Sequence, residues 1–267
     1  MSRRPLALLL AALGCSSTSM APSWRTVTAT QELRGEHAMT VNVQYGAGRF
    51  HLAPGVGSEL YRMQLRYDEN SVTPVREYDQ ATQTLRLGVK GRSGGGIRVR
   101  GRNRNDAPPS MDLALSPDLP LTLTLEMGAV EADADLGGLA LQRVTFRTGA
   151  SESRLRFSRP TTAACEQLTI EAGAAEIHAE QLANSSCARV TVNGGVGEVT
   201  LDFGGTWSRS MSADINVGVG SLKLRLPRGV GVSVSSTGSW PASTRPASRS
   251  TATPTSRRIT TARGTGW

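Results

Sequence analysis

Three cysteines carry the most reactive side chains of this sequence, and their positions suggest two different reactions. Cys15 follows a short apolar run, whereas Cys165 and Cys187 lie 22 residues apart in the second half of the chain. A thiol near the N-terminus of an exported protein can accept a lipid, and two thiols in an oxidising compartment can form a disulfide. Cys15 is therefore considered apart from the other two.

The N-terminal segment has the layout of a bacterial signal peptide. Two arginines precede the apolar run Leu6–Leu13, which is too short to span a bilayer as a stable anchor. The stretch Ala12-Leu13-Gly14-Cys15 resembles a bacterial lipobox, and Ser16 resembles the outer-membrane choice in an organism with two membranes. We predict that residues 1–15 are a lipoprotein signal peptide and that Cys15 is lipidated. An ordinary cleaved signal peptide and a buried N-terminal helix are the alternatives.

Acidic residues recur at a fixed distance from a series of glycines. Glu131, Glu152, Glu176 and Glu198 each lie three residues after one of them. If these positions stack about 4.8 Å apart, arginine partners, solvent or a bound cation must relieve the repulsion of the like charges. We interpret the row as a solvated edge of turns, with a Ca²⁺ site as the alternative.

Other patterns give no support for catalysis. His37, His51 and His178 do not cluster and have no metal-ligand spacing. The sequence contains no nucleophile elbow, no phosphate-binding loop and no zinc-protease motif. We therefore predict a protein that is not an enzyme and that has no cofactor, metal or small-molecule substrate.

The charge distribution argues against a nucleic-acid-binding domain. The net charge is +8, yet residues 110–240 carry 14 acids and 10 bases. The surplus of bases lies in a glycine-rich loop and in residues 241–267, whereas nucleic-acid binding needs a basic face on folded structure. The loop arginines are candidates for contact with an anionic surface, or else are solvated. They are Arg92, Arg98, Arg100, Arg102 and Arg104.

A repeat centred on glycine runs through the body of the chain. Apolar residues stand five and three positions before each glycine and six positions after it, with a polar residue four before it. The glycines are Gly46, Gly128, Gly149, Gly173, Gly195 and Gly218, and from Gly128 onward they are 21, 24, 22 and 23 residues apart. The alternation predicts two short strands per copy around a tight corner. Since one copy cannot offset its ordering entropy, we predict an all-β solenoid of stacked copies, similar to a parallel β-helix.

The same register brings two cysteines together. Cys165 and Cys187 each lie eight residues before a repeat glycine, so they occupy one column in adjacent copies. Stacked strands are about 4.8 Å apart, and a disulfide tolerates Cα separations of about 4.4–6.8 Å. We predict a Cys165–Cys187 bridge, and the alternative is two buried free thiols.

The remaining segments complete the predicted organisation. Strand patterns around residues 61–67, 72–75 and 84–89 indicate an antiparallel β-insertion or cap near the N-terminus. The tail is rich in Ser, Thr, Ala, Pro and Arg, a composition typical of disorder. The predicted parts are a linker (16–24), an N-terminal β-region with the basic loop (25–109), the solenoid repeats (110–240) and the disordered tail (241–267).

Several motifs together resemble one known family. They are the lipobox-like start, the segment Val43–Phe50, the segment Asp112–Pro120 and the repeated Gly-Ala-x-Glu turns. Over roughly residues 25–240 the chain resembles the bacterial toast-rack proteins, which are related to the LiaF-like group of the cell-wall-active antibiotics response. The resemblance implies an all-β solenoid-like domain of the cell envelope without catalysis. It also implies a link to envelope-stress signalling, although this chain lacks the transmembrane helices of some relatives.

Together these features predict a non-enzymatic cell-envelope lipoprotein whose rigid β-solenoid contacts an envelope protein or a glycan. We expect a lipid anchor in a membrane, the outer membrane facing the periplasm where two membranes exist. A regulator of envelope-stress signalling that acts through a membrane partner is one alternative, and a polysaccharide-active β-helix enzyme is the other. The enzyme needs acids and arginines converging in a groove with aromatic rings for sugar stacking, and aromatic residues make up only 4% of the chain.

Overall fold

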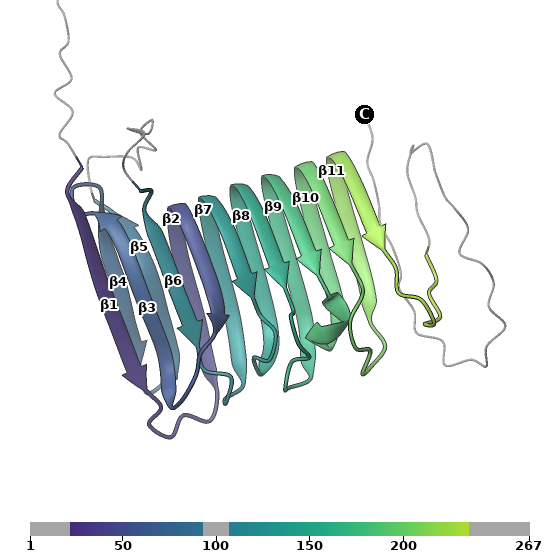
Figure 1. Cartoon of the computed structure of the whole chain (residues 1–267), viewed down its shortest axis with the longest axis horizontal. Coiled ribbons are helices and arrows are strands. Elements are labelled where there is room, and N and C mark those ends of the chain that lie inside the picture. Colours follow the sequence, from purple (N-terminus) through teal and green to yellow (C-terminus); the bar gives the residue numbers. More distant parts are fainter. Residues whose placement is uncertain (1–21, 93–106, 235–267) are drawn as a thin grey trace, which may run out of the picture.

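The computed structural model describes residues 22–92 and 107–234 (Figure 1). Eleven strands form one sheet, and one short 3-10 helix, η1, spans Leu182–Ser185. The predicted lipidation site Cys15, four of the loop arginines (Arg98, Arg100, Arg102 and Arg104) and the tail from residue 241 lie outside the described residues. The strands are β1 (Trp24–Glu32), β2 (Met39–Pro54), β3 (Glu59–Asp68), β4 (Val72–Asp79), β5 (Thr84–Gly91), β6 (Ser110–Leu115), β7 (Leu121–Asp135), β8 (Leu141–Arg156), β9 (Cys165–Glu180), β10 (Cys187–Asp202) and β11 (Ser212–Arg225).

The six repeat copies form a row of stacked, parallel coils. Strand β2 pairs with β7, and β7, β8, β9, β10 and β11 then pair in chain order, all in parallel. Each of these strands runs up one side of the stack, folds over at the upper edge and returns down the other side, where loops join the coils (Figure 1). The predicted β-solenoid is confirmed.

The strands differ from the expected pattern of two short strands per copy. Each copy is one strand of 14 to 16 residues that continues through the bend, as in β8 and β9. All coils bend at the same position, so the parallel ladder resumes immediately beyond the glycine: Met127 pairs with Thr148, and Ala129 with Ala150. The bend therefore does not interrupt the strand.

The repeat glycines permit this bend because the backbones approach closely there. A Cβ atom on Gly195 would lie 2.5 Å from the carbonyl oxygen of Gly173 in the preceding coil. Real Cβ atoms essentially never come that near to a backbone oxygen. The requirement at this position is thus the absence of a side chain.

The core lies between the two legs of each coil, that is, between the halves of the strand before and after the repeat glycine. The residues five and three positions before the glycine point inward and are buried, as Val144 and Phe146 show with no exposed surface. From the other leg, the residues six positions after the glycine, such as Leu155 and Leu201, complete the core. This confirms the alternation predicted from the repeat.

The N-terminal strands cap the stack. They add to the sheet on each side of the first coil separately. The first half of β2 pairs with β5, which forms an antiparallel hairpin with β4. The second half of β2 pairs with β6, which continues through antiparallel β3 to antiparallel β1. The predicted antiparallel cap is therefore present, divided between both faces.

The disulfide closes one coil at its lower edge. Cys165 and Cys187 are partners in the β9–β10 register and form an S–S bond, with their Cα atoms 4.1 Å apart. The segment between the two cysteines contains η1. The predicted pairing is confirmed.

Asn184 in η1 ties three coils together, and its replacement should be costly. Its side-chain Nδ2 donates to the carbonyl oxygen of Phe157 (2.8 Å), and its Oδ1 accepts from the backbone N–H of Thr206 (2.7 Å). The residue is only 4% exposed. Asn184→Ala leaves both backbone groups without these bonds and should lower the free energy of unfolding by about 2–3 kcal/mol in urea denaturation. Asn42→Ala, on an outward-facing column, is the control, and an equal loss in both variants would contradict this role.

Candidate binding surfaces

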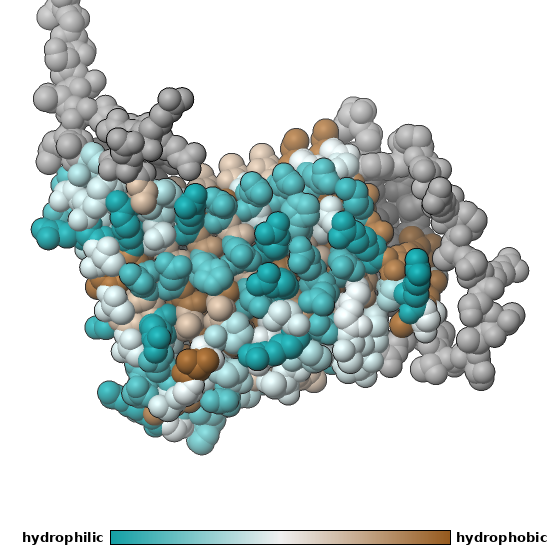
Figure 2. All heavy atoms as spheres, viewed as in Figure 1, coloured by the Kyte–Doolittle hydropathy of each residue, from teal (hydrophilic) through white to brown (hydrophobic). Residues whose placement is uncertain are grey.

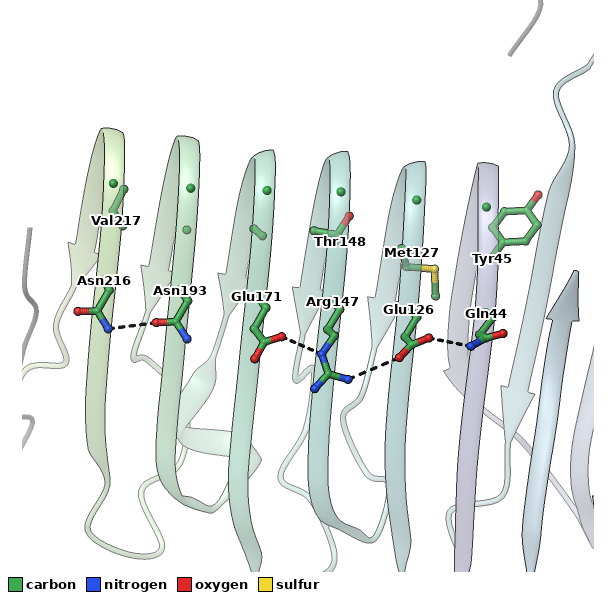
Figure 3. A pocket seen from close by; sticks show the side chains of 18 of the residues that line it. Gln44, Tyr45, Glu126, Met127, Arg147, Thr148, Glu171, Asn193, Asn216 and Val217 are labelled. Atoms are coloured by element: carbon green, nitrogen blue, oxygen red, sulfur yellow. Dashed lines mark hydrogen bonds and ion pairs between the residues drawn. The ribbon is translucent and has the colours of Figure 1, made fainter. Parts of the chain in front are cut away.

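A groove follows the bend along the outside of the stack. It has a volume of about 1010 Å³ and crosses β2 and β7 to β11 (Figure 3). We call it the bend groove. Its lining includes the six repeat glycines Gly46, Gly128, Gly149, Gly173, Gly195 and Gly218. It also includes the polar side chains two positions before each glycine: Gln44, Glu126, Arg147, Glu171, Asn193 and Asn216.

Four of these polar side chains form a continuous row of hydrogen bonds and ion pairs. Gln44 Nε2 donates to Glu126 Oε2 (2.8 Å), and Arg147 lies between Glu126 (3.5 Å) and Glu171 (2.7 Å), as Figure 3 shows. The hydrogen bond and charge of Glu171 raise the pKa of Arg147. Because exposed ion pairs contribute little stability, the main consequence of the row is where it places these polar groups on the surface.

Two carboxamides continue this row over the last two coils. Asn216 Nδ2 donates to Asn193 Oδ1 at 3.1 Å. We call the six side chains together the polar ladder. Sequence reasoning missed this ladder, because it used the columns five, four and three residues before the glycine and not the column two before it. A polar residue occupies that column in all six copies, a signal that was present in the sequence.

Two further polar groups of the lining are buried and unpartnered. Tyr45 is 3% exposed and Thr148 is 7% exposed, and neither hydroxyl has a hydrogen-bond partner among the described residues. Burial, together with the charge of Asp112, raises the pKa of Tyr45. Figure 3 shows the Thr148 hydroxyl directed toward the glycine column.

The rim of the bend groove on the far side of the glycines is apolar. Val196 and Val219, each one residue after a repeat glycine, are neighbours across β10 and β11 and are 57% and 63% exposed. Alanines hold the same position in β7, β8 and β9. Figure 2 shows apolar surface along the upper edge of the stack, where the strands bend, above a hydrophilic face. The groove thus has one polar and one apolar side.

The predicted row of glutamates is aligned on the opposite leg. Glu131, Glu152, Glu176 and Glu198 occupy one register across β7 to β10. Ion pairs relieve part of the repulsion, since Arg49 lies 3.2 Å from Glu131 and Lys223 lies 3.2 Å from Glu198, and His178 Nε2 forms a hydrogen bond with Glu176 Oε1 (2.8 Å). Within residues 22–92 and 107–234, no group of three or more acids, histidines or cysteines has a geometry that could hold a metal ion.

A smaller pocket of about 390 Å³ lies on this second face. It brings together His51 and His178, which are far apart in the sequence, with Asp133 and Arg154 between them in the register. One carboxylate oxygen of Asp133 is buried without a hydrogen-bond partner in the described part of the chain. Both histidines lie five residues after a repeat glycine and so share one outward column, in which β7 and β8 separate them.

The carboxylate of Asp135, at the end of β7, has hydrogen-bond donors and an arginine around it. Burial alone would raise the pKa of its carboxyl group, but hydrogen bonds from Ser158 and Gly137 and the charge of Arg156 lower it. Arg156 approaches Asp135 to 3.5 Å from the next coil. The opposite charges of Asp135 and Arg156 are therefore paired across adjacent coils.

Arg92 is the one loop arginine whose position is described. Its backbone N–H donates to the carbonyl oxygen of Ser71, and its Nη1 donates to that of Glu69 (3.1 Å). The guanidinium is thus tied to the turn between β3 and β4. In the described residues, no helix has the length and apolar character needed to cross a membrane.

Comparisons with known proteins identify a family. The model of the family described as the N-terminal domain of toast_rack, DUF2154, matches residues 21–180 and 161–225. The two matches overlap over residues 161–180, as a repetitive sequence allows. No curated protein matches the chain.

Among solved structures, two cover almost the whole chain at low identity. One is a putative cell adhesion protein from Clostridium sporogenes, with 15% identity, a TM-score of 0.42, and coverage of 91% of this chain and 97% of its own. The other is a putative adhesin from Bacteroides fragilis, with 12% identity, a TM-score of 0.39, and coverage of 92% and 100%.

Proposed function

Since the chain belongs to the family of the N-terminal domain of toast_rack, DUF2154, we propose that it is a non-catalytic lipoprotein of the bacterial cell envelope. In this proposal the lipid on Cys15 holds the protein at the membrane, and the β-solenoid presents a rigid surface to an envelope protein or a glycan. The observation that carries the proposal is the ordered outer surface of the stack. Polar side chains line up in a row across strands that bend at one common position.

Two further features support an exported location. The segment Ala12-Leu13-Gly14-Cys15 resembles a lipobox, and disulfides such as Cys165–Cys187 persist mainly in oxidising compartments. A single acyl chain gives only marginal membrane binding, so stable anchoring needs at least two chains or a second signal. The expected modification is therefore a diacyl or triacyl group on Cys15.

The test is intact mass spectrometry combined with fractionation of native cells. We expect the wild-type protein in the membrane fraction, starting at Cys15 and carrying the mass of two or three acyl chains. Cys15→Ala should lose the lipid mass and the membrane fraction, while the fold of residues 22–234 stays the same by circular dichroism. An unlipidated protein that retains Met1 would contradict the proposal.

A further inference from the structure

The bend groove has the dimensions and the regularity of a site for a linear polymer. It crosses six coils, and adjacent strands in a sheet are about 4.8 Å apart, so its length is about 24 Å. Each coil contributes one polar side chain and one glycine to it. A ligand that lies along the stack therefore meets similar contacts at every coil.

The polar ladder offers hydrogen bonds along one side of the groove. A carboxamide has two N–H donors and a carbonyl oxygen with two lone pairs, and the bond between Asn193 and Asn216 uses little of that capacity. Gln44, Glu126 and Glu171 add further planar polar groups along the same row. Such planar amides and carboxylates suit the hydroxyl groups of sugars.

An apolar rim beside the groove and one unpartnered hydroxyl add to the polar ladder. Val196 and Val219 expose more than half of their surface beside the glycines, and pyranose rings have apolar C–H faces. The hydroxyl of Thr148, directed toward the glycine column, is buried and has no partner among the described residues. Buried polar groups without partners are rare in proteins, which makes the Thr148 hydroxyl a candidate contact for a water or a ligand at the bend.

Charge and spacing disfavour two other kinds of polymer. Two carboxylates, Glu126 and Glu171, flank one guanidinium, Arg147, so the ladder is slightly acidic and offers little attraction to a polyanion such as nucleic acid or an acidic polysaccharide. An extended peptide advances about 3.3 Å per residue, so its side chains fall out of step with coils about 4.8 Å apart. In a β-1,4-linked glycan, by contrast, each pyranose ring advances by about one strand spacing.

We propose that the bend groove binds a neutral, linear, β-1,4-linked glycan that lies along the stack with one pyranose ring per coil. This rests on the proposed function, since it names the ligand class of the envelope surface. The polar ladder binds the ring hydroxyls, and the glycines let the backbone approach the chain closely.

The test is isothermal titration calorimetry of the purified protein with cellohexaose and with N-acetylchitohexaose. Maltohexaose, which has the composition of cellohexaose but curls because of its α-linkages, is the ligand control. We expect binding of at least one β-linked oligosaccharide and none of maltohexaose. Asn193→Ala combined with Asn216→Ala should weaken binding about tenfold through the loss of two hydrogen-bonding side chains.

Arginine variants on β8 provide a matched comparison. Arg147→Ala removes the centre of the polar ladder and should also weaken binding, whereas Arg154→Ala removes an equally exposed, ion-paired arginine on the opposite leg and should leave it unchanged. Circular dichroism checks that each variant is folded. Equal binding of maltohexaose, no binding of either β-linked oligosaccharide, or a loss caused by Arg154→Ala alone would overturn the proposal. A lipidated, membrane-bound protein that binds none of them would refute the groove assignment and leave the envelope function standing.

Discussion

Gly195→Val should prevent the protein from reaching a stable native state, with a loss of at least about 3 kcal/mol in the free energy of unfolding. The new Cβ atom would lie 2.5 Å from the carbonyl oxygen of Gly173 and 3.4 Å from that of Ala172. Both atoms belong to the backbone of the preceding coil, so no rotamer change relieves the overlap. The two coils would have to separate at the bend, which disrupts the parallel ladder between β9 and β10 on both sides of it. Urea denaturation followed by far-ultraviolet circular dichroism measures the effect.

Gly91→Val is the matched control for this substitution. Gly91 ends β5, and an added Cβ atom there meets nothing within 4 Å. We expect a change within about 0.5 kcal/mol, as for most surface substitutions. If Gly195→Val unfolds at the same urea concentration as the wild type, close backbone approach is not the reason for the glycine.

Removal of the disulfide should cost about 3 kcal/mol of stability. The bridge closes a loop with a sequence separation of 22 residues, and its loss returns that loop's freedom to the unfolded chain. Cys165→Ala combined with Cys187→Ala is the preferred change, since both positions are fully buried and alanine places no polar group there. For a chain of this size the melting temperature should fall by roughly 6–12 °C.

A reductant distinguishes the contribution of the disulfide to stability from side effects of the two substitutions. Dithiothreitol should lower the melting temperature of the wild type by a similar amount and leave the double variant unchanged. Two free thiols in the oxidised, exported protein, detected by mass spectrometry under non-reducing conditions, would rule out this source of stability.

The sequence alone determined the coil, its register and its cross-link. Strand alternation and the need for glycine are local properties, visible in columns such as Val144, Phe146 and Gly149. Because each copy repeats this local pattern, aligning the copies also aligns the residues that stack on one another. For that reason the spacing of Cys165 and Cys187 from their repeat glycines was enough to pair them, and the β9–β10 register places them opposite each other.

Only the tertiary structure decided how the pieces beyond the repeat come together. The cap divides between the two legs of β2 because β5 pairs with its first half and β6 with its second, a choice made by contacts between distant segments. The polar ladder likewise depends on side-chain reach: Arg147 contacts Glu126 and Glu171, which lie 21 and 24 residues away in the chain but on the adjacent strands. Such contacts form only once parallel pairing has brought the strands within about 5 Å of one another, so the groove belongs to the assembled stack and not to any single repeat.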